Sequence, residues 1–349
     1  MVLRFGGSES VCVYTVAFQP DGKHLLGGGS GDETRRWRLS DGQEVGKQIG
    51  VRVYALSVSR DHNWIVGGTK KGASVWDGQM HEEVIEVESP NTVEAVDVSP
   101  DSARFATVTD RKDASIWRIT SGERLVGPLE HDDYVTGIRF SPNGEHIATA
   151  CLGNSIRIFN SHNGVNLVTI KTDIPSWGPA TPLAWSSDGQ QIFAASHNNK
   201  IRSFNTSTGS QLAESQILHN GENDVHSIAL APNNKFIATF ARHSISFLDS
   251  STLTRIGTVI ENLDGEHTRS IAMSADSSHL ATGGYEGRIA IRDLSKILPD
   301  SYGPFHVSCN LSMSNNPHSV SYGDELHRHP FARTYDKMSM IIIHRILIE

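Results

Sequence analysis

The sequence contains few patterns of residues that could carry out chemistry, and the first of them is a run of glycines. Residues 27–31 read GGGSG, which resembles a phosphate-binding loop. Such a loop needs a helix directly after it, because the amides at a helix N-terminus hold the anion. Here the following residues, GDETRRWRL, alternate as in a β-strand. We therefore predict a tight turn at these glycines and no nucleotide site.

Histidines could also provide chemistry by binding a metal. His81–Glu83 reads HEE, like the start of a zinc-protease motif, but Ile85 stands where the second histidine belongs. In the last part of the chain, His327 and His329 could approach one metal. No third or fourth ligand can be identified for them, and the number of ligands is what defines such a site. We predict no metal site.

Catalytic nucleophiles leave recognisable patterns, and this sequence has none of those that we know. A Gly-x-Ser-x-Gly element is absent, and the aspartates and glutamates are scattered along the chain. We therefore assign no catalytic residue and no cofactor. A fold that gathers distant segments around an axis could still assemble a site that the sequence does not display.

The elements that must position any site come from a repeated unit, best seen at His131–Asn160. Tyr134–Phe140 alternates as a strand, a turn follows at Ser141–Gly144, and two more short strands follow at His146–Cys151 and Ser155–Asn160. The residues equivalent to Phe140, which stand 40 to 45 positions apart, are Phe18, Val58, Val98, Phe140, Trp185, Leu230 and Met273. Four strands repeated at this period predict the blades of a β-propeller.

Short motifs make the resemblance specific. VWD at Val75–Asp77, LD at Leu248–Asp249 and RD at Arg292–Asp293 stand where WD repeats carry Trp-Asp, and LEH at Leu129–His131 stands where they carry Gly-His. The chain resembles the WD-repeat β-propeller family over residues 1–295. The family's hydrogen-bond network of Asp, His, Ser/Thr and Trp is complete in no repeat.

The resemblance implies an all-β fold, a seven-bladed β-propeller of four-stranded antiparallel blades. In this family a strand from the start of the chain becomes the outer strand of the last blade. We expect Val2–Phe5 to pair in this way with the strand around Arg288–Arg292, because an unpaired sheet edge is a liability. Residues 296–349 change character, and we predict a poorly ordered, largely irregular C-terminal tail that ends in the apolar run Met340–Glu349.

Composition limits the classes of partner and compartment. The net charge of −8 argues against a general binder of nucleic acid or of anionic membranes. The first residues lack the apolar core of a signal peptide, and no apolar run is long enough to span a membrane. We expect a cytoplasmic protein, with the nucleus as the alternative. Three widely spaced cysteines suggest neither a disulfide framework nor a zinc site; they are Cys12, Cys151 and Cys309.

Aromatic and cationic residues are the candidates for binding. In a propeller, the loops before the first strands and the loops between the second and third strands share one rim. Tyr, Trp and Arg on one rim match the composition of interface hot spots. The alternative is that Trp177 covers the axial opening and Tyr134 packs on a neighbouring blade. The residues that we predict to form a protein-binding rim are Arg52, Arg111, Tyr134, Trp177, Arg242 and Tyr285.

We therefore predict a non-catalytic scaffold or recognition module, a monomeric propeller within a larger complex, that binds a protein or peptide. Because several basic residues lie on the predicted rim of an acidic chain, we expect the partner segment to be acidic or phosphorylated. The alternative is an enzyme with its active site in the axial pocket. Thr120–Leu125 (TSGERL) faintly resembles quinoprotein dehydrogenase repeats, although the adjacent cysteines of those enzymes are absent; a hydrolase is the other possibility.

Overall fold

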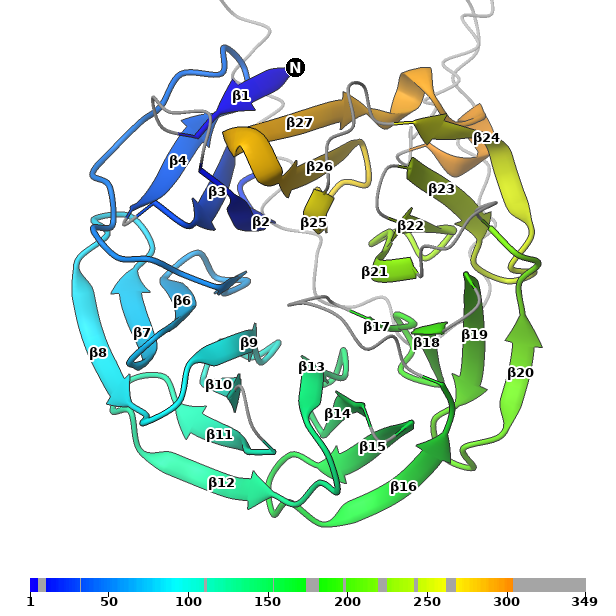
Figure 1. The fold of residues 1–349 in the computed structure, drawn as a ribbon, viewed down its shortest axis with the longest axis horizontal. Helices are drawn as coiled ribbons and strands as arrows, with labels where there is room; N and C mark the ends of the chain where they lie inside the picture. Colours follow the sequence, from blue (N-terminus) through cyan, green and yellow to red (C-terminus); the bar gives the residue numbers. More distant parts are fainter. Residues whose placement is uncertain are drawn as a thin grey trace, which may run out of the picture. The chain divides into compact units, whose positions relative to one another are not determined.

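Seven antiparallel β-sheets lie around a common axis and form a propeller (Figure 1). The computed structural model describes residues 1–5, 11–31, 33–109, 112–152, 154–173, 182–196, 199–218, 225–241, 244–261 and 268–303. Six of the sheets have four hydrogen-bonded strands, and the sheet of blade one has three. In blade seven the fourth strand comes from the start of the chain. The predicted all-β, seven-bladed fold is confirmed.

The strands of each blade follow one another from the axis outward. Blades one to three contain β2 (Val13–Phe18), β3 (His24–Gly29), β4 (Thr34–Arg38), β5 (Ala55–Val58), β6 (Trp64–Thr69), β7 (Gly72–Asp77), β8 (Glu83–Glu88), β9 (Val93–Val98), β10 (Arg104–Thr109), β11 (Ala114–Arg118) and β12 (Arg124–Leu129). Blades four and five contain β13 (Val135–Phe140), β14 (His146–Cys151), β15 (Ser155–Asn160), β16 (Asn166–Lys171), β17 (Leu183–Trp185), β18 (Gln191–Ser196), β19 (Lys200–Asn205) and β20 (Gln211–Glu214). Blades six and seven contain β21 (Val225–Leu230), β22 (Phe236–Ala241), β23 (Ser244–Asp249), β24 (Arg255–Glu261), β25 (Thr268–Met273), β26 (His279–Gly284) and β27 (Arg288–Asp293), with the 3₁₀ turn η2 (Tyr285–Gly287) before β27.

The ring is closed by the start of the chain. β1 (Val2–Arg4) pairs antiparallel with β27, with Leu3 opposite Ile289, and so becomes the outer strand of blade seven (Figure 1). Leu3 is buried between blades seven and one, whereas Val2 on the other face of the strand is exposed. The predicted pairing is confirmed, and it satisfies the edge of β27 that would otherwise be open.

A recurring turn joins the first and second strands of most blades. In five blades a serine side chain accepts a hydrogen bond from the main-chain N–H five residues later and donates one to an Asp or Asn two residues later. The fourth residue of the turn has positive φ, which Gly22, Gly144 and Gly189 adopt without strain. The five serines are Ser59, Ser99, Ser141, Ser186 and Ser274.

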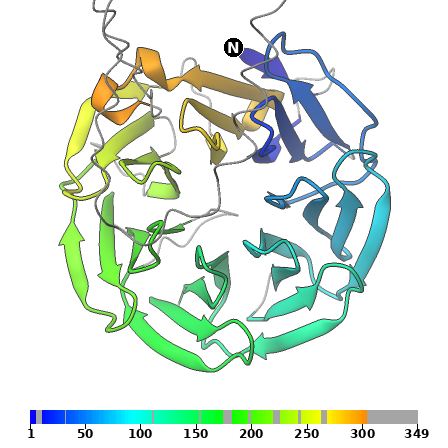
Figure 2. The same cartoon turned by 180° about the vertical axis from the view of Figure 1, so that it is seen from behind.

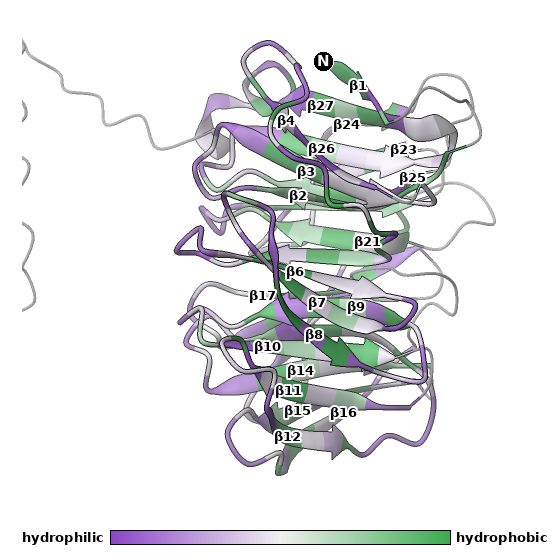
Figure 3. Cartoon of the chain, turned by 90° about the vertical axis from the view of Figure 1, so that its left-hand side faces the viewer, coloured by the Kyte–Doolittle hydropathy of each residue, from purple (hydrophilic) through white to green (hydrophobic). Residues whose placement is uncertain are grey.

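Apolar residues fill the interfaces between neighbouring blades rather than one central core. Figure 2, seen from behind, shows the outer strands β8, β12, β16, β20 and β24 on the circumference, and Figure 3 shows the strands running across from one face to the other. Among the described residues, the cluster between blades one and two has six buried members, while the other six interfaces have eight to eleven. The junction of blades one and two therefore has the smallest apolar core.

The glycine run is part of a strand. Gly27, Gly28 and Gly29 are the last three residues of β3, so the prediction of a tight turn there was wrong for these residues. A Cβ on Gly27 would lie 2.9 Å from the ring of Trp37, and one on Gly29 would lie 2.0 Å from a main-chain oxygen. These glycines are needed because neighbouring groups approach too closely for a side chain. Trp37 can therefore be buried, at 3 % exposure.

Parts of the family's hydrogen-bond network occur in different blades. In blade four, His131 Nε2 lies 2.8 Å from Thr149 Oγ1, and in blade three the Trp117 indole donates to Thr107 across 2.9 Å. In blade seven an arginine, Arg292, stands where a tryptophan would be. Within the described residues no blade combines all four partners, as the sequence predicts. Burial between sheets must then supply most of the stability.

The described chain continues beyond β27. The 3₁₀ turns η3 (Leu294–Lys296) and η4 (Asp300–Tyr302) follow, and Leu298 is buried in the cluster between blades six and seven. The Tyr302 hydroxyl donates to Asp249 of blade six across 3.0 Å. The first residues after the blades thus help to cover blade six. Residues 304–349, with His327, His329 and Met340–Glu349, lie outside the described residues, and the division at residue 295 remains a prediction.

Candidate protein-binding face

The strand register places two sets of loops at one rim of each blade. In blade four, Val135 at the start of the first strand and Ser155 at the start of the third both pair with Cys151 at the end of the second. The loop before a first strand and the loop between second and third strands therefore lie on the same side. We refer to this side of the propeller as the rim face, and to the other as the turn face.

Three of the six residues predicted for the binding rim lie in the described part of the chain. Arg52 precedes β5, Tyr134 precedes β13 and Tyr285 lies in η2, and all three are exposed. Tyr134 is 50 % exposed and Tyr285 47 %, so about half of each side chain is open to solvent. Arg111, Trp177 and Arg242 lie outside the described residues.

A row of side chains that the sequence analysis missed joins Tyr285 across three blades. The rings of Tyr14 and Tyr54 stack with their centroids 5.5 Å apart and 7° between their planes. The Arg269 guanidinium lies 5.0 Å from the Tyr14 ring centroid and 5.5 Å from that of Tyr285. The order along this row is Tyr54, Tyr14, Arg269 and Tyr285. Stacking of this kind holds each ring in a fixed orientation.

The repeat alignment contained a signal for this row. Tyr14, Tyr54 and Arg269 each stand four residues before the position equivalent to Phe140, at the inner edge of the rim face. From the segments before the first strands, the predicted rim took residues six positions before, such as Tyr134, and left out those four positions before. The candidate surface therefore includes the side chains that stand four and six positions before each equivalent of Phe140.

The axial channel runs through the centre of the propeller. We call its end at the rim face upper and its end at the turn face lower. Its upper cavity, about 50 Å³ in volume, is lined by Tyr14, Tyr54 and Arg269 among others, and has room for a few water molecules. The lower cavity of about 430 Å³ opens on the turn face. Arg139 borders both cavities. Of these two cavities, both lined by described residues, the one at the turn face is the larger.

Asp97 and Arg139 form a charged pair in the lower cavity. Arg139 Nη1 lies 3.0 Å from Asp97 Oδ1, and the Phe140 N–H donates to Asp97 Oδ2 across 2.7 Å. Burial raises the pKa of Asp97 above its ordinary value, although Arg139 acts in the opposite direction. Across the described residues, no group of three His, Cys, Asp or Glu side chains is close enough to hold a metal ion.

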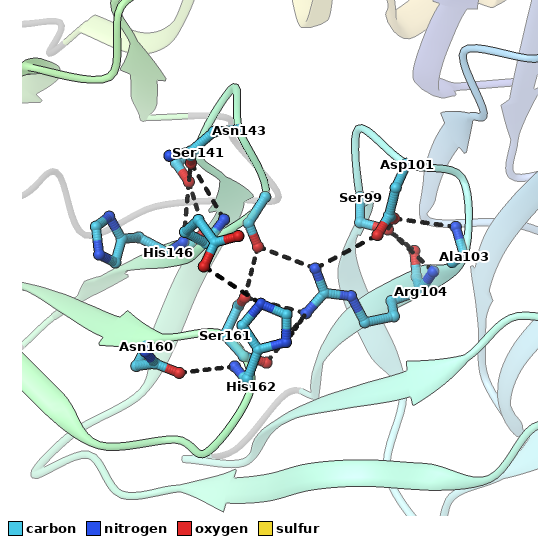
Figure 4. A network of polar contacts seen from close by, with 12 residues as sticks. Ser99, Asp101, Ala103, Arg104, Ser141, Asn143, His146, Asn160, Ser161 and His162 are labelled. Atoms are coloured by element: carbon cyan, nitrogen blue, oxygen red, sulfur yellow. Dashed lines mark hydrogen bonds and ion pairs between the residues drawn. The ribbon is translucent and has the colours of Figure 1, made fainter.

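The turn face contains a polar network that joins blades three and four (Figure 4). Arg104 is buried, and its guanidinium donates to the Gly144 carbonyl across 3.0 Å and to Ser161 Oγ across 3.0 Å. Its Cζ also lies 5.5 Å from the centroid of the Phe140 ring. Ser161 Oγ in turn donates to the Gly144 carbonyl at 2.5 Å. This arginine therefore joins blade three to blade four.

Comparison with known proteins agrees with this fold. Residues 124–160, which include His131 and Thr149, match the family described as WD domain, G-beta repeat. One subunit of chromatin assembly factor 1 of Mus musculus is 24 % identical over 169 residues, covering 48 % of this chain and 26 % of that protein. Periodic tryptophan protein 2 of Arabidopsis thaliana is 25 % identical over 138 residues, covering 36 % of this chain and 15 % of that protein.

A third relative has a similar extent of match. Protein HIR1 of Eremothecium gossypii is 22 % identical over 198 residues, covering 46 % of this chain and 24 % of that protein. The match spans about a quarter or less of the length of each of these relatives. The seven blades, the matched repeat and these relatives together confirm the resemblance to WD-repeat β-propeller proteins.

Proposed function

We propose that this propeller is a non-catalytic scaffold that presents its rim face to a protein partner. The observation that carries the proposal is the ordered row of Tyr54, Tyr14, Arg269 and Tyr285. Tyrosine and arginine are enriched in interface hot spots. Stacking already orders these four side chains, so a partner would restrict them little further. Blades that hold many loops on one side also favour recognition of an extended surface.

The proposed partner segment is acidic or phosphorylated. Arg52 and Lys70 are exposed on the rim face of an otherwise acidic chain, and the sequence adds Arg111 and Arg242 to the same set of loops. An arginine fork can bind two oxygens of a carboxylate or phosphate at once. An apolar anchor of the partner would contact Trp177 or the exposed ring of Tyr134.

The names of the relatives bear on location. Two of them, from Mus musculus and Gallus gallus, are named as subunits of chromatin assembly factor 1, and another is named intraflagellar transport protein 122 homolog. These names do not agree on one process, so we propose only membership of a larger complex. The chromatin names favour the nucleus over the cytoplasm. Among the described residues there is no helix of the length and apolarity that crossing a membrane requires.

Quantitative capture of partners tests the proposal. Wild-type protein is compared with three rim variants, Tyr134→Ala/Tyr285→Ala, Arg111→Glu/Arg242→Glu and Trp177→Ala. The matched control is Val165→Ala/Leu167→Ala, two exposed apolar residues at the outer edge of blade four. We expect the rim variants to lose partners that the control keeps, at unchanged melting temperature. If all variants recover the same partners equally, the rim face is not the working surface.

A second candidate function, an enzyme in the axial channel, is favoured by Asp97. Burial raises the pKa of its carboxyl group, and perturbed carboxyl groups in cavities are typical of general acids and bases. A screen of hydrolase substrates and of quinone cofactors against purified protein separates the two classes. Turnover that is lost in Asp97→Asn, with rim variants unaffected, would favour the enzyme.

A further inference from the structure

The outer edge of blade one departs from the regular blade and opens a groove. β4 has no continuous fourth partner within the described residues; isolated bridges join Thr34 to Ile49 and Trp37 to Glu44. Between these bridges the outer chain has four residues where β4 has two, so the chain must bulge outward. Gly46 permits the bulge, because its φ of 79° is one that a residue with a Cβ rarely adopts.

The bulge forms one wall of a groove between blades one and two, with a volume of about 790 Å³. Residues 47–52 form this wall, and the β6–β7 loop with the outer half of blade two forms the other. Ile49 and Trp76, both 3 % exposed, are the apolar residues at its floor. A volume of this size is typical of ligand-binding sites.

Three lysines give the groove a positive charge. Lys47, Lys70 and Lys71 are exposed on its walls, and Arg52 borders its end at the rim face. In the part of the chain that the structure describes, the side chains of these three lysines form no ion pair and no hydrogen bond. Unpaired lysines around one groove favour an anionic ligand.

Two carboxylates limit the kind of anion. Glu83 and Glu86 of β8 also line the groove, and no ion pair joins them to the lysines within the described ranges. They would repel a long polyanion, as would the net charge of −8. A short peptide whose acidic residues lie toward the lysines avoids this repulsion. The groove therefore fits a peptide better than nucleic acid.

We propose that the groove between blades one and two binds an acidic segment of the protein partner in an extended conformation. This inference rests on the proposed function, because the groove opens on the rim face beside Arg52 and Tyr54. Carboxylates of the segment pair with Lys47, Lys70 and Lys71, while the rest of the segment lies along the floor of the groove. The segment thus extends the interface from the rim face down the side of the propeller.

The first test is binding of a fluorescein-labelled peptide of alternating glutamate and serine to the full chain, read by anisotropy. Lys70→Glu/Lys71→Glu should weaken binding about tenfold, since two exposed attractions become repulsions. Glu83→Gln/Glu86→Gln should tighten it about threefold. The control Lys23→Glu/Lys171→Glu changes two exposed lysines that do not line the groove and should change affinity less than about twofold.

The second test locates the peptide directly. A carbodiimide joins a peptide carboxylate to a lysine amine as an amide, with loss of water, and mass spectrometry maps the joined residues. We expect joining at Lys47, Lys70 and Lys71. Equal joining at Lys23 and Lys171, equal affinity of all variants, or stronger binding of a single-stranded DNA oligonucleotide each overturns the inference.

The outcome is separable from that of the proposed function. If the groove variants bind the peptide as wild type does, while the rim variants lose protein partners, the groove inference fails and the scaffold remains. If wild type and all rim variants capture the same partners, the scaffold fails. In that case the peptide can still bind wild type and the control variant but not the groove variants. The groove would then bind anions without being part of a partner interface, which contradicts the partner segment proposed here.

Discussion

The imidazole of His81 in blade two donates a hydrogen bond from Nδ1 to the main-chain carbonyl of Lys47 in blade one, across 2.5 Å. A carbonyl oxygen can only accept, so the proton lies on Nδ1 and Nε2 carries the lone pair. His81 is 4 % exposed and has a φ of 56°. This histidine therefore occupies a backbone conformation that usually belongs to glycine.

Glycines at the equivalent turn of other blades explain the histidine. Gly42, Gly122, Gly164 and Gly209 have positive φ there, and a Cβ on any of them would lie within 3.1 Å of the outer strand of the preceding blade. Before His81 that outer strand is the bulged chain of blade one, which leaves room for a ring. Leu253 occupies the same place after the short strand β20. Both side chains fill space that an irregular outer strand leaves.

The first prediction concerns pH. Burial lowers the pKa of His81, and the charge of Arg36 adds to this, while the hydrogen bond to Lys47 and the charge of Asp77 oppose it. Below the ordinary value near 6.5 the unfolded chain binds a proton that the folded chain does not. This residue's contribution to the free energy of unfolding is therefore complete above pH 6.5 and falls as the pH decreases toward the lowered pKa.

The matched variant is His81→Leu, because Leu253 shows that leucine fits this turn. Denaturant unfolding of both proteins between pH 8 and pH 5 measures the difference. As the pH falls, we expect the free energy of unfolding of wild type to decrease more than that of the variant. The contribution of His131 is the same in both proteins. A difference that is constant over this range would contradict a neutral, buried imidazole at position 81.

The second prediction concerns Arg104. Arg104→Met should lower the free energy of unfolding by about 2–4 kcal/mol, because the buried acceptors Gly144 and Ser161 lose their charged donor. Arg118→Met is the control, since its side chain is 50 % exposed and has one pair, with Glu123. The control should change stability by less than about 1 kcal/mol. Equal effects in chemical denaturation would mean that the network does not hold blades three and four.

The third prediction concerns ring closure, and one strand supplies both variant and control. Leu3→Asp places a charge in the interface of blades seven and one, where Leu3 is 4 % exposed. It should cost about 2–4 kcal/mol and lower the melting temperature by several degrees. Val2→Asp, at a position 64 % exposed, should have little effect. Deletion of residues 1–8 should resemble Leu3→Asp and also promote aggregation; an unaltered melting temperature would mean that β1 does not close the ring.

The fourth prediction concerns the end of the propeller. A chain that stops at Ser308 keeps Leu298 and the bond from Tyr302 to Asp249, so its melting temperature should equal that of the full chain. A chain that stops at Ser295 loses both, and calorimetry should show a lower melting temperature. Identical values for the two shorter chains would place the boundary at residue 295, as the sequence predicts.

The repeats made the fold predictable because each blade contains its own turn signals. Phe140 and its equivalents are followed by turn residues in every blade, and the strand pairs could be placed from these alone. The pairing of Val2–Phe5 with the strand around Arg288–Arg292 also followed, because the last repeat has only three strands of its own in the sequence. Information local to each repeat was sufficient for the turns and strands, and the missing fourth strand of the last repeat was sufficient for the closure.

Contacts between blades could not be predicted in the same way. Tyr14, Arg269 and Tyr285 come from opposite ends of the chain, and their row depends on which blades become neighbours after closure. The bulge at Gly46 was missed for a related reason. A glycine in a polar segment does not reveal that a histidine of the next blade will fill the space beneath it.

Blade one is joined to its neighbours unequally. On one side β1 and β27 close the ring over a buried interface. On the other side, within the described chain, the smallest apolar cluster lies near buried polar atoms without partners, among them His81 Nε2 and Gln19 Oε1. Amide protons of β4 and β7 should then exchange with solvent through a local opening at this joint, before the other six interfaces separate. A ligand in the groove would contact both blades and stabilise the interface between them. Its binding could then be detected as slower amide exchange in both blade one and blade two.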